Sequence, residues 1–112
     1  MTTINIGIID YGLGNIFSLM NSCNHLGFKC FTIQEPKHFT KASHLILPGV
    51  GAYGAACLAL DEAKMKKPLS EAINGDTPTL GICLGMQLMF KASLEGGLHS
   101  GLDFFCVLPL KL

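Results

Sequence analysis

Four mainly apolar stretches of the chain alternate with segments in which apolar residues recur at helical spacing. The apolar stretches cover residues 4–9, 28–33, 44–47 and 79–82. Strands that are buried on both faces are apolar throughout, whereas strands with one wet face alternate apolar and polar residues. The pattern therefore predicts an α/β fold in which a parallel sheet carries helices on both faces.

Capping and breaking residues place the helices between these strands. Asn15 can cap a helix that Gly27 ends, and a short helical turn is expected near Phe39. A second helix is expected from Gly54 to about Met65. A third is expected to open at Pro68 and end near residue 75, and a fourth follows Cys83. Beyond residue 90 a glycine-rich loop leads to residues 104–108, which predict a fifth strand.

Length and composition narrow the possible classes of protein. With 112 residues the chain forms one domain, and only 14% of it is charged, against about 25% in typical soluble domains. This deficit indicates that a partner or further polypeptide covers part of the surface. A net charge of zero, with eight lysines and no arginine, indicates neither a nucleic-acid partner nor an anionic membrane.

The cysteines and the first residues indicate a compartment. Five cysteines without a Cys-x-x-Cys pair are typical of reduced thiols in a cytosol, and nothing has the spacing of a metal site. The N-terminus has no basic region, and its apolar segment reaches Asp10 too early for a signal peptide or a membrane span. We expect a cytoplasmic protein without a metal or a cofactor.

Cys83 is the strongest candidate for chemistry. It lies in Gly81-Ile82-Cys83-Leu84-Gly85, between an apolar strand and an apolar helix. A sharp strand-to-helix turn with glycines on both sides of its tip presents a nucleophile. A buried cysteine in a glycine-rich turn is the alternative for this pentapeptide alone.

Three glycine-bearing loops are expected at the carboxyl ends of the strands, where open α/β sheets bind ligands. They cover residues 10–15, 48–54 and 81–85. Small residues in the second loop allow its backbone to approach a carbonyl attacked by Cys83, so that one of its amides can act with the Leu84 N–H as an oxyanion hole.

The second loop also has the Gly-x-Gly-x-x-Gly spacing of a dinucleotide site, from Gly49 to Gly54. That fingerprint belongs to the first strand and helix and needs an acidic residue at the end of the next strand. Here it follows the third strand. Glu71 lies in a helical pattern and Asp76 precedes the next strand, so a dinucleotide-binding domain is the weaker alternative.

Three blocks of sequence together resemble a known family. They are Ile8-Ile9-Asp10-Tyr11-Gly12-Leu13-Gly14-Asn15, Leu47-Pro48-Gly49-Val50-Gly51-Ala52 and Leu80-Gly81-Ile82-Cys83-Leu84-Gly85-Met86-Gln87-Leu88. In order and spacing they are similar to the class I glutamine amidotransferases, which have a flavodoxin-like fold. The first block most resembles the glutaminase subunits of imidazole glycerol phosphate synthase in histidine biosynthesis.

The resemblance implies a cysteine glutaminase that makes glutamate and ammonia through a thioester. Cys83 would be its nucleophile, the backbone amides of Val50 and Leu84 its oxyanion hole, and Gly49, Gly51 and Gln87 its contacts with glutamine. It also implies a heterodimer with a barrel-type synthase (cyclase) subunit that receives the ammonia, without a cofactor.

The sequence departs from this family in its general base. The family supplies a His-x-Glu pair from a later strand, and this sequence has none. Its four histidines are poorly placed: His25 lies in the first helix, His38 and His44 lie at or before the start of the third strand, and His99 lies in a glycine loop.

The missing pair leads to an expectation about the whole chain. We expect residues 1–112 to be the amino-terminal part of a single amidotransferase domain, incomplete at its carboxyl end and inactive alone. The alternative is a non-catalytic remnant or interaction module of the same fold.

Overall fold

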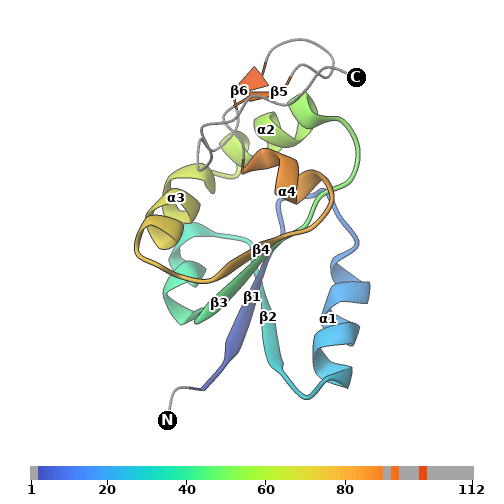
Figure 1. Cartoon of the computed structure of the whole chain (residues 1–112), viewed down its shortest axis with the longest axis vertical. Helices are drawn as coiled ribbons and strands as arrows, with labels where there is room; N and C mark the ends of the chain where they lie inside the picture. The colour runs from blue at the N-terminus through green and yellow to red at the C-terminus, as the bar shows by residue number, and fades with distance from the viewer. Residues whose placement is uncertain (1–2, 90–91, 94–98, 101–112) are drawn as a thin grey trace.

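The computed structural model describes residues 3–89, 92–93 and 99–100, and its centre is a parallel sheet (Figure 1). The four strands are β1 (Asn5–Ile9), β2 (Lys29–Ile33), β3 (His44–Leu47) and β4 (Thr79–Gly81). They lie in the order β2-β1-β3-β4, and every neighbouring pair is parallel. The predicted strands and the predicted sheet are confirmed.

Helices cover both faces of the sheet, as the pattern predicted (Figure 1). On one face α1 (Ile16–His25) packs Cys23 against Ile8 and Ile46. On the other lie α2 (Tyr53–Glu62), α3 (Lys66–Asn74), the short 3-10 helix η1 (Pro36–Lys41) and α4 (Leu84–Leu88).

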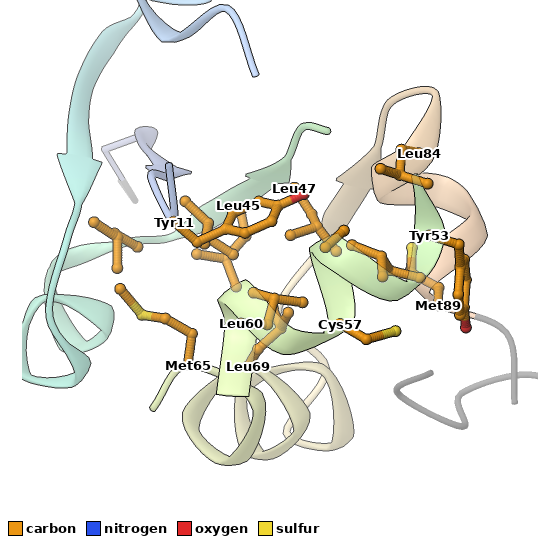
Figure 2. Packing of buried hydrophobic residues seen from close by; sticks show 14 residues of the cluster. Tyr11, Leu45, Leu47, Tyr53, Cys57, Leu60, Met65, Leu69, Leu84 and Met89 are labelled. Atoms are coloured by element: carbon orange, nitrogen blue, oxygen red, sulfur yellow. The ribbon is translucent and has the colours of Figure 1, made fainter. Parts of the chain in front are cut away.

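The main core lies between the sheet and α2, α3 and α4. Leu45 and Leu47 of β3 meet Leu60 of α2 and Leu69 of α3, and all four are almost completely buried (Figure 2). Burial of such a side chain contributes about 1.5–3 kcal/mol each. This contribution ties the carboxyl end of β3, where the second glycine loop begins, to the rigid part of the molecule.

Local chemistry explains where α1 begins and ends. The Asn15 side-chain oxygen accepts a hydrogen bond of 3.2 Å from the Ser18 N–H, which satisfies one of the free donors of the first turn. Gly27 has a φ of +86°, a left-handed conformation that favours glycine and ends the helix. Both predicted boundaries are confirmed.

The boundary between α2 and α3 differs from the prediction. Helix α2 ends at Glu62 because Lys64 turns to a φ of +58° and the Met65 N–H reaches back to the Leu60 oxygen at 3.0 Å. Met65 was expected to be helical, but its side chain is fully buried and closes the turn. Helix α3 then begins at Lys66, and Pro68 lies in its first turn, where no backbone N–H is required.

The segment after α4 contains a second, antiparallel pair of strands, β5 (Ala92–Ser93) and β6 (His99–Ser100). His99 therefore lies in a strand and not in a loop, which corrects the expectation. Two-residue strands are too short to show a hydrophobic period, so no pattern in the sequence predicted them. The predicted strand at residues 104–108 lies outside the described residues.

One face of the described sheet is partly bare beside β4. Leu80 is 57% exposed there, and Ile4, Ile6, Phe28 and Ile46 line the same apolar pocket of about 340 Å³. This exposed surface fits the low content of charged residues. Across the part of the chain that the structure describes, no helix combines the length and the apolar character that a membrane crossing requires.

Candidate functional site

The structure brings all three glycine-bearing loops to one place at the carboxyl end of the sheet. A pocket of about 200 Å³, here called the Asn15 pocket, is lined by residues of each loop, among them Asn15, Pro48 and Cys83. A neighbouring pocket of about 370 Å³, the Gln87 pocket, is lined by Gly49, Val50, Gly51, Cys83, Leu84 and Gln87. Its lining is the complete set of residues that the sequence singled out.

Cys83 lies at the joint between β4 and α4 in a backbone conformation that side chains rarely adopt. Its φ is +53° and its ψ is −119°, and the residue is exposed. Strained backbone of this kind costs about 1–3 kcal/mol and persists only where the surrounding structure enforces it. The turn has the form of a nucleophile elbow, a sharp strand-to-helix turn that exposes the residue at its tip.

The two glycines of this elbow are required by close packing. A Cβ at Gly85 would lie 1.8 Å from the Leu47 carbonyl oxygen, and one at Gly81 would lie 2.7 Å from the Met86 Cα. The Leu47 oxygen cannot easily turn away because it accepts a hydrogen bond of 3.0 Å from the Ile82 N–H. Backbone against backbone therefore fixes the position of Cys83.

The loop of residues 48–51, here called the oxyanion loop, packs against the elbow with fewer steric constraints. Gly51 has a φ of +100° with nothing within 4 Å of its Cβ position, and Val50 is 58% exposed. Two hydrogen bonds hold the loop. The Tyr11 hydroxyl donates to the Pro48 oxygen at 2.6 Å, and the Leu84 N–H donates to the Gly49 oxygen at 3.3 Å.

The second of these bonds bears on the predicted oxyanion hole. Leu84 was expected to offer its amide to a substrate, and in this structure that N–H is directed at the Gly49 oxygen. The donor follows Cys83 directly in the chain, with a backbone carbonyl as its acceptor. The exchange of this acceptor for a substrate oxygen requires a turn of the Gly49 carbonyl.

Tyr11 was not singled out by the sequence as a site residue. It is almost completely buried, and burial together with the nearby Cys57 raises its pKa to about 12. The hydroxyl therefore stays protonated and able to donate. The only signal in the sequence was its place directly after the first strand, at the edge where the loops meet.

Among residues 3–89, none with a charge lines either pocket. The histidines of residues 3–89 also lie elsewhere. His25 ends α1, His38 lies in η1 and 3.6 Å from a Glu35 carboxylate oxygen, and His44 begins β3 with its ring nitrogen 2.9 Å from the Ser43 hydroxyl. The amino end of β3 is opposite to the end that carries Cys83, so no histidine of residues 3–89 lies beside the cysteine in these pockets.

Comparison with known families agrees with the site. The family model described as "Glutamine amidotransferase class-I" matches residues 7–98. This range contains all three loops.

Curated relatives point to one branch of that family. The chain is 47% identical over 97 residues to "Imidazole glycerol phosphate synthase subunit HisH" of Geobacillus sp. (strain WCH70). The aligned residues make up 87% of this chain and 46% of the relative. The protein of the same name in Bacillus subtilis (strain 168) is 40% identical, with the same coverage. "Imidazole glycerol phosphate synthase hisHF, chloroplastic" of Arabidopsis thaliana is 43% identical over 97 residues, 87% of this chain and 16% of that protein.

A solved structure matches in fold. The protein described as "Crystal structure of glutamine amidotransferase" superposes with a TM-score of 0.77 at 15% identity and covers 92% of this chain and 54% of that one. The chain thus spans about half the length of the subunits named HisH and of the matching structure.

Proposed function

Since this chain belongs to the class I glutamine amidotransferase family, we propose that it carries the nucleophile and the substrate pocket of a glutaminase serving imidazole glycerol phosphate synthase. One observation supports this proposal above the others. The six residues predicted from the sequence line a single pocket, with Cys83 at the tip of a strained elbow. Four of the six are glycines or would act through a backbone amide, so that Cys83 and Gln87 supply the reactive and polar side chains.

The chemistry follows from a cysteine facing a carboxamide. The Cys83 thiolate attacks the side-chain carbonyl carbon of glutamine, the C–N bond breaks, and the nitrogen leaves as ammonia with a proton delivered to it. The resulting thioester is attacked by water, which returns the thiol and releases glutamate. In each half the carbonyl oxygen becomes an oxyanion that two backbone amides can stabilise.

The oxyanion hole forms from the Val50 and Leu84 amides if the Gly49–Val50 peptide turns. This motion takes the Gly49 oxygen off the Leu84 N–H, where it now lies at 3.3 Å. Gly49 and Gly51 flank the moving peptide, and Gly51 already has a positive φ that side chains resist. The loop therefore has the conformational freedom that the step needs.

The general base is expected from polypeptide that corresponds to the unmatched half of the relatives. None of the histidines that the structure describes in residues 3–89 lines the pocket with Cys83. Removal of a triad member typically costs several orders of magnitude in rate. We expect the 112-residue chain alone to show little or no turnover of glutamine.

The names of the relatives suggest the destination of the ammonia. We propose a synthase (cyclase) subunit of the barrel type as partner in a heterodimer, in histidine biosynthesis and in the cytoplasm. The bare apolar surface beside β4 and the low charge content support the presence of additional covering polypeptide.

Covalent labelling tests the proposal without requiring turnover. The glutamine analogue 6-diazo-5-oxo-L-norleucine should modify Cys83 and be slowed by L-glutamine but not by D-glutamine, as measured by peptide mass spectrometry. Cys23 and Cys57 are buried and serve as internal controls, and Cys83→Ala should abolish the labelling. Equal labelling of Cys83 with and without L-glutamine would contradict the proposal.

A non-catalytic interaction module is the second candidate, favoured by the lack of a histidine in the described pockets. It predicts that Cys83→Ala leaves every effect of the chain on a synthase partner unchanged. Loss of that effect in Cys83→Ala would exclude it.

A further inference from the structure

A side chain from outside the oxyanion loop, that of Tyr11, directly holds the loop's first residue. Its hydroxyl donates to the Pro48 oxygen at 2.6 Å, and both groups are buried. From this contact we propose that Tyr11 is a positioning residue for the oxyanion loop, an inference that rests on the proposed glutaminase function. Tyr11 is not among the described residues that line the expected substrate pocket, so its effect passes through the backbone of Pro48 and Gly49.

The bond fixes one peptide and leaves the next free. The Pro48 carbonyl belongs to the Pro48–Gly49 peptide, and proline also restricts its own φ. With that plane held, the first peptide that can turn is Gly49–Val50, the one that carries the Val50 amide. Reorientation is thereby confined to the peptide that carries the Val50 amide and whose carbonyl now occupies the Leu84 amide.

The Tyr11 hydroxyl also fills the space beside Gly49. A Cβ at Gly49 would lie 2.5 Å from this oxygen, 3.0 Å from the Gly85 nitrogen and 3.1 Å from the Leu84 Cβ. Gly49 is thus enclosed between Tyr11 on one side and the elbow on the other. Tyr11 sets the distance between the loop and the elbow, and with it the spacing of the Val50 and Leu84 amides.

Removal of the hydroxyl should loosen the loop while the core remains filled. In Tyr11→Phe the ring keeps its place beside Leu45 and Leu47 (Figure 2), but the Pro48 oxygen loses its donor. We expect the Leu84 amide, which donates to Gly49, to exchange with solvent at least about tenfold faster, measured by NMR hydrogen exchange on the full chain.

Tyr53→Phe is the matched control. Tyr53 is fully buried in the same cluster, and its pKa is likewise raised to about 12 by burial and by Cys57. Removal of the Tyr53 hydroxyl should change the exchange rate of the Leu84 amide by less than about twofold from that of the wild type. The rates are compared at equal global stability. Equal acceleration in the two variants, or no acceleration in Tyr11→Phe, would overturn the proposal.

A second readout ties the positioning role to the chemistry. Labelling of Cys83 by the diazo-ketone analogue of glutamine should slow about tenfold in Tyr11→Phe, whereas labelling by the small reagent iodoacetamide should change less than twofold. A merely structural role would alter both reactions alike. Failure of the wild-type chain to recognise the glutamine analogue would count against the proposed function. The hydrogen-exchange result would still test whether the Tyr11 hydroxyl holds the oxyanion loop in place.

Gly49→Ala disturbs the contact between Tyr11 and the loop by a change in the loop itself. It provides the test if Tyr11→Phe does not fold. The new methyl group displaces the Tyr11 hydroxyl, so the Leu84 amide should again exchange at least about tenfold faster. An unchanged Leu84 rate in Gly49→Ala would overturn the proposal independently of Tyr11→Phe.

Discussion

The two glycine-rich turns that form the site are held in place by different forces. At the elbow of residues 81–85, backbone atoms lie so close that any Cβ on Gly81 or Gly85 would overlap them. In the oxyanion loop of residues 48–51, Gly51 has open space around it and two hydrogen bonds fix the backbone. Steric contact resists displacement steeply, whereas a hydrogen bond can exchange its partner.

This difference suits the two tasks in a glutaminase. The nucleophile needs one position, and an enforced φ of +53° at Cys83 gives it one. The oxyanion loop needs two arrangements, because the Leu84 amide that should meet the substrate is directed at the Gly49 oxygen here. The following predictions test whether the elbow is in fact rigid and the loop adaptable.

Gly85→Ala should have the largest effect. Its methyl group would overlap the Leu47 oxygen, which is itself held by the Ile82 N–H, so the carbonyl cannot move without the loss of that bond. We expect a loss of about 4 kcal/mol in the free energy of unfolding, measured by urea denaturation.

Gly75→Ala provides the control for this substitution. Its φ is −87° and its nearest neighbour would be the Glu71 oxygen at 3.2 Å, so we expect a change below about 1 kcal/mol. Similar losses in the two variants would show that the elbow is not sterically fixed.

Alkaline pH should lower the free energy of unfolding through the two buried tyrosines, of which Tyr11 holds the oxyanion loop. Burial raises the pKa of Tyr11 and of Tyr53 to about 12, from 10. Between pH 10 and 12 the unfolded chain has lost these protons and the folded chain keeps them, so the free energy of unfolding falls as pH rises, by about 1.4 kcal/mol per pH unit for each tyrosine. Below pH 10 neither contributes to the pH dependence.

The chain has two tyrosines and no tryptophan, so tyrosinate absorbance near 295 nm reports this titration directly. Tyr11→Phe should reduce the alkaline slope by about 1.4 kcal/mol per pH unit, and Tyr53→Phe should reduce it by a similar amount. An alkaline slope that is identical in wild type and Tyr11→Phe would contradict the buried, donating state of the Tyr11 hydroxyl.

The elbow and the loop also differ in how far the sequence could predict them. The Gly-x-Cys-x-Gly spacing predicted the elbow because a sharp strand-to-helix turn requires small residues on both sides of its tip, although the neighbour that excludes a side chain at Gly85 is the distant Leu47 oxygen. The four strands and their sheet were predictable for a similar reason, since continuous burial leaves an apolar signature along each strand.

Two of the missed features, the role of Tyr11 and the direction of the Leu84 amide, depend on contacts distant in sequence. Tyr11 meets Pro48 across 37 positions, and no local pattern encodes that pairing. The predicted end of α2 was wrong because Met65 was interpreted as part of the helical pattern, whereas its buried side chain closes the turn after the helix. The direction of the Leu84 amide toward Gly49 is a property of the folded backbone and has no residue signature.

Gly51→Ala should have an intermediate effect with a distinct cause. The methyl group has open space, but a φ of +100° is strained for any side chain, so we expect a loss of about 2 kcal/mol. Gly12→Ala is a conformational match, with a φ of +93° and nothing within 4 Å, and should cost a similar amount.

Gly51→Ala and Gly12→Ala should differ in the rate at which the glutamine analogue labels Cys83. Gly51 lines the Gln87 pocket and Gly12 does not, so only Gly51→Ala should slow the labelling of Cys83 by the glutamine analogue, by about tenfold. If Gly12→Ala slows it equally, the loop has no special role and the contrast with the elbow is lost.

Cys83→Gly should have the smallest effect on the free energy of unfolding, and it should raise this free energy where the glycine substitutions lower it. Glycine adopts a φ of +53° with a ψ of −119° more readily than cysteine does, so the substitution relieves backbone strain. The greater entropy of glycine in the unfolded chain offsets part of this gain. The free energy of unfolding should therefore rise by about 1 kcal/mol. Cys83→Ala removes the same thiol and keeps the Cβ, so it should bring no such gain. A denaturation midpoint that rises equally in both variants would attribute the gain to the loss of the sulfur, whereas a rise in Cys83→Gly alone would show that the elbow holds its nucleophile against a conformational cost.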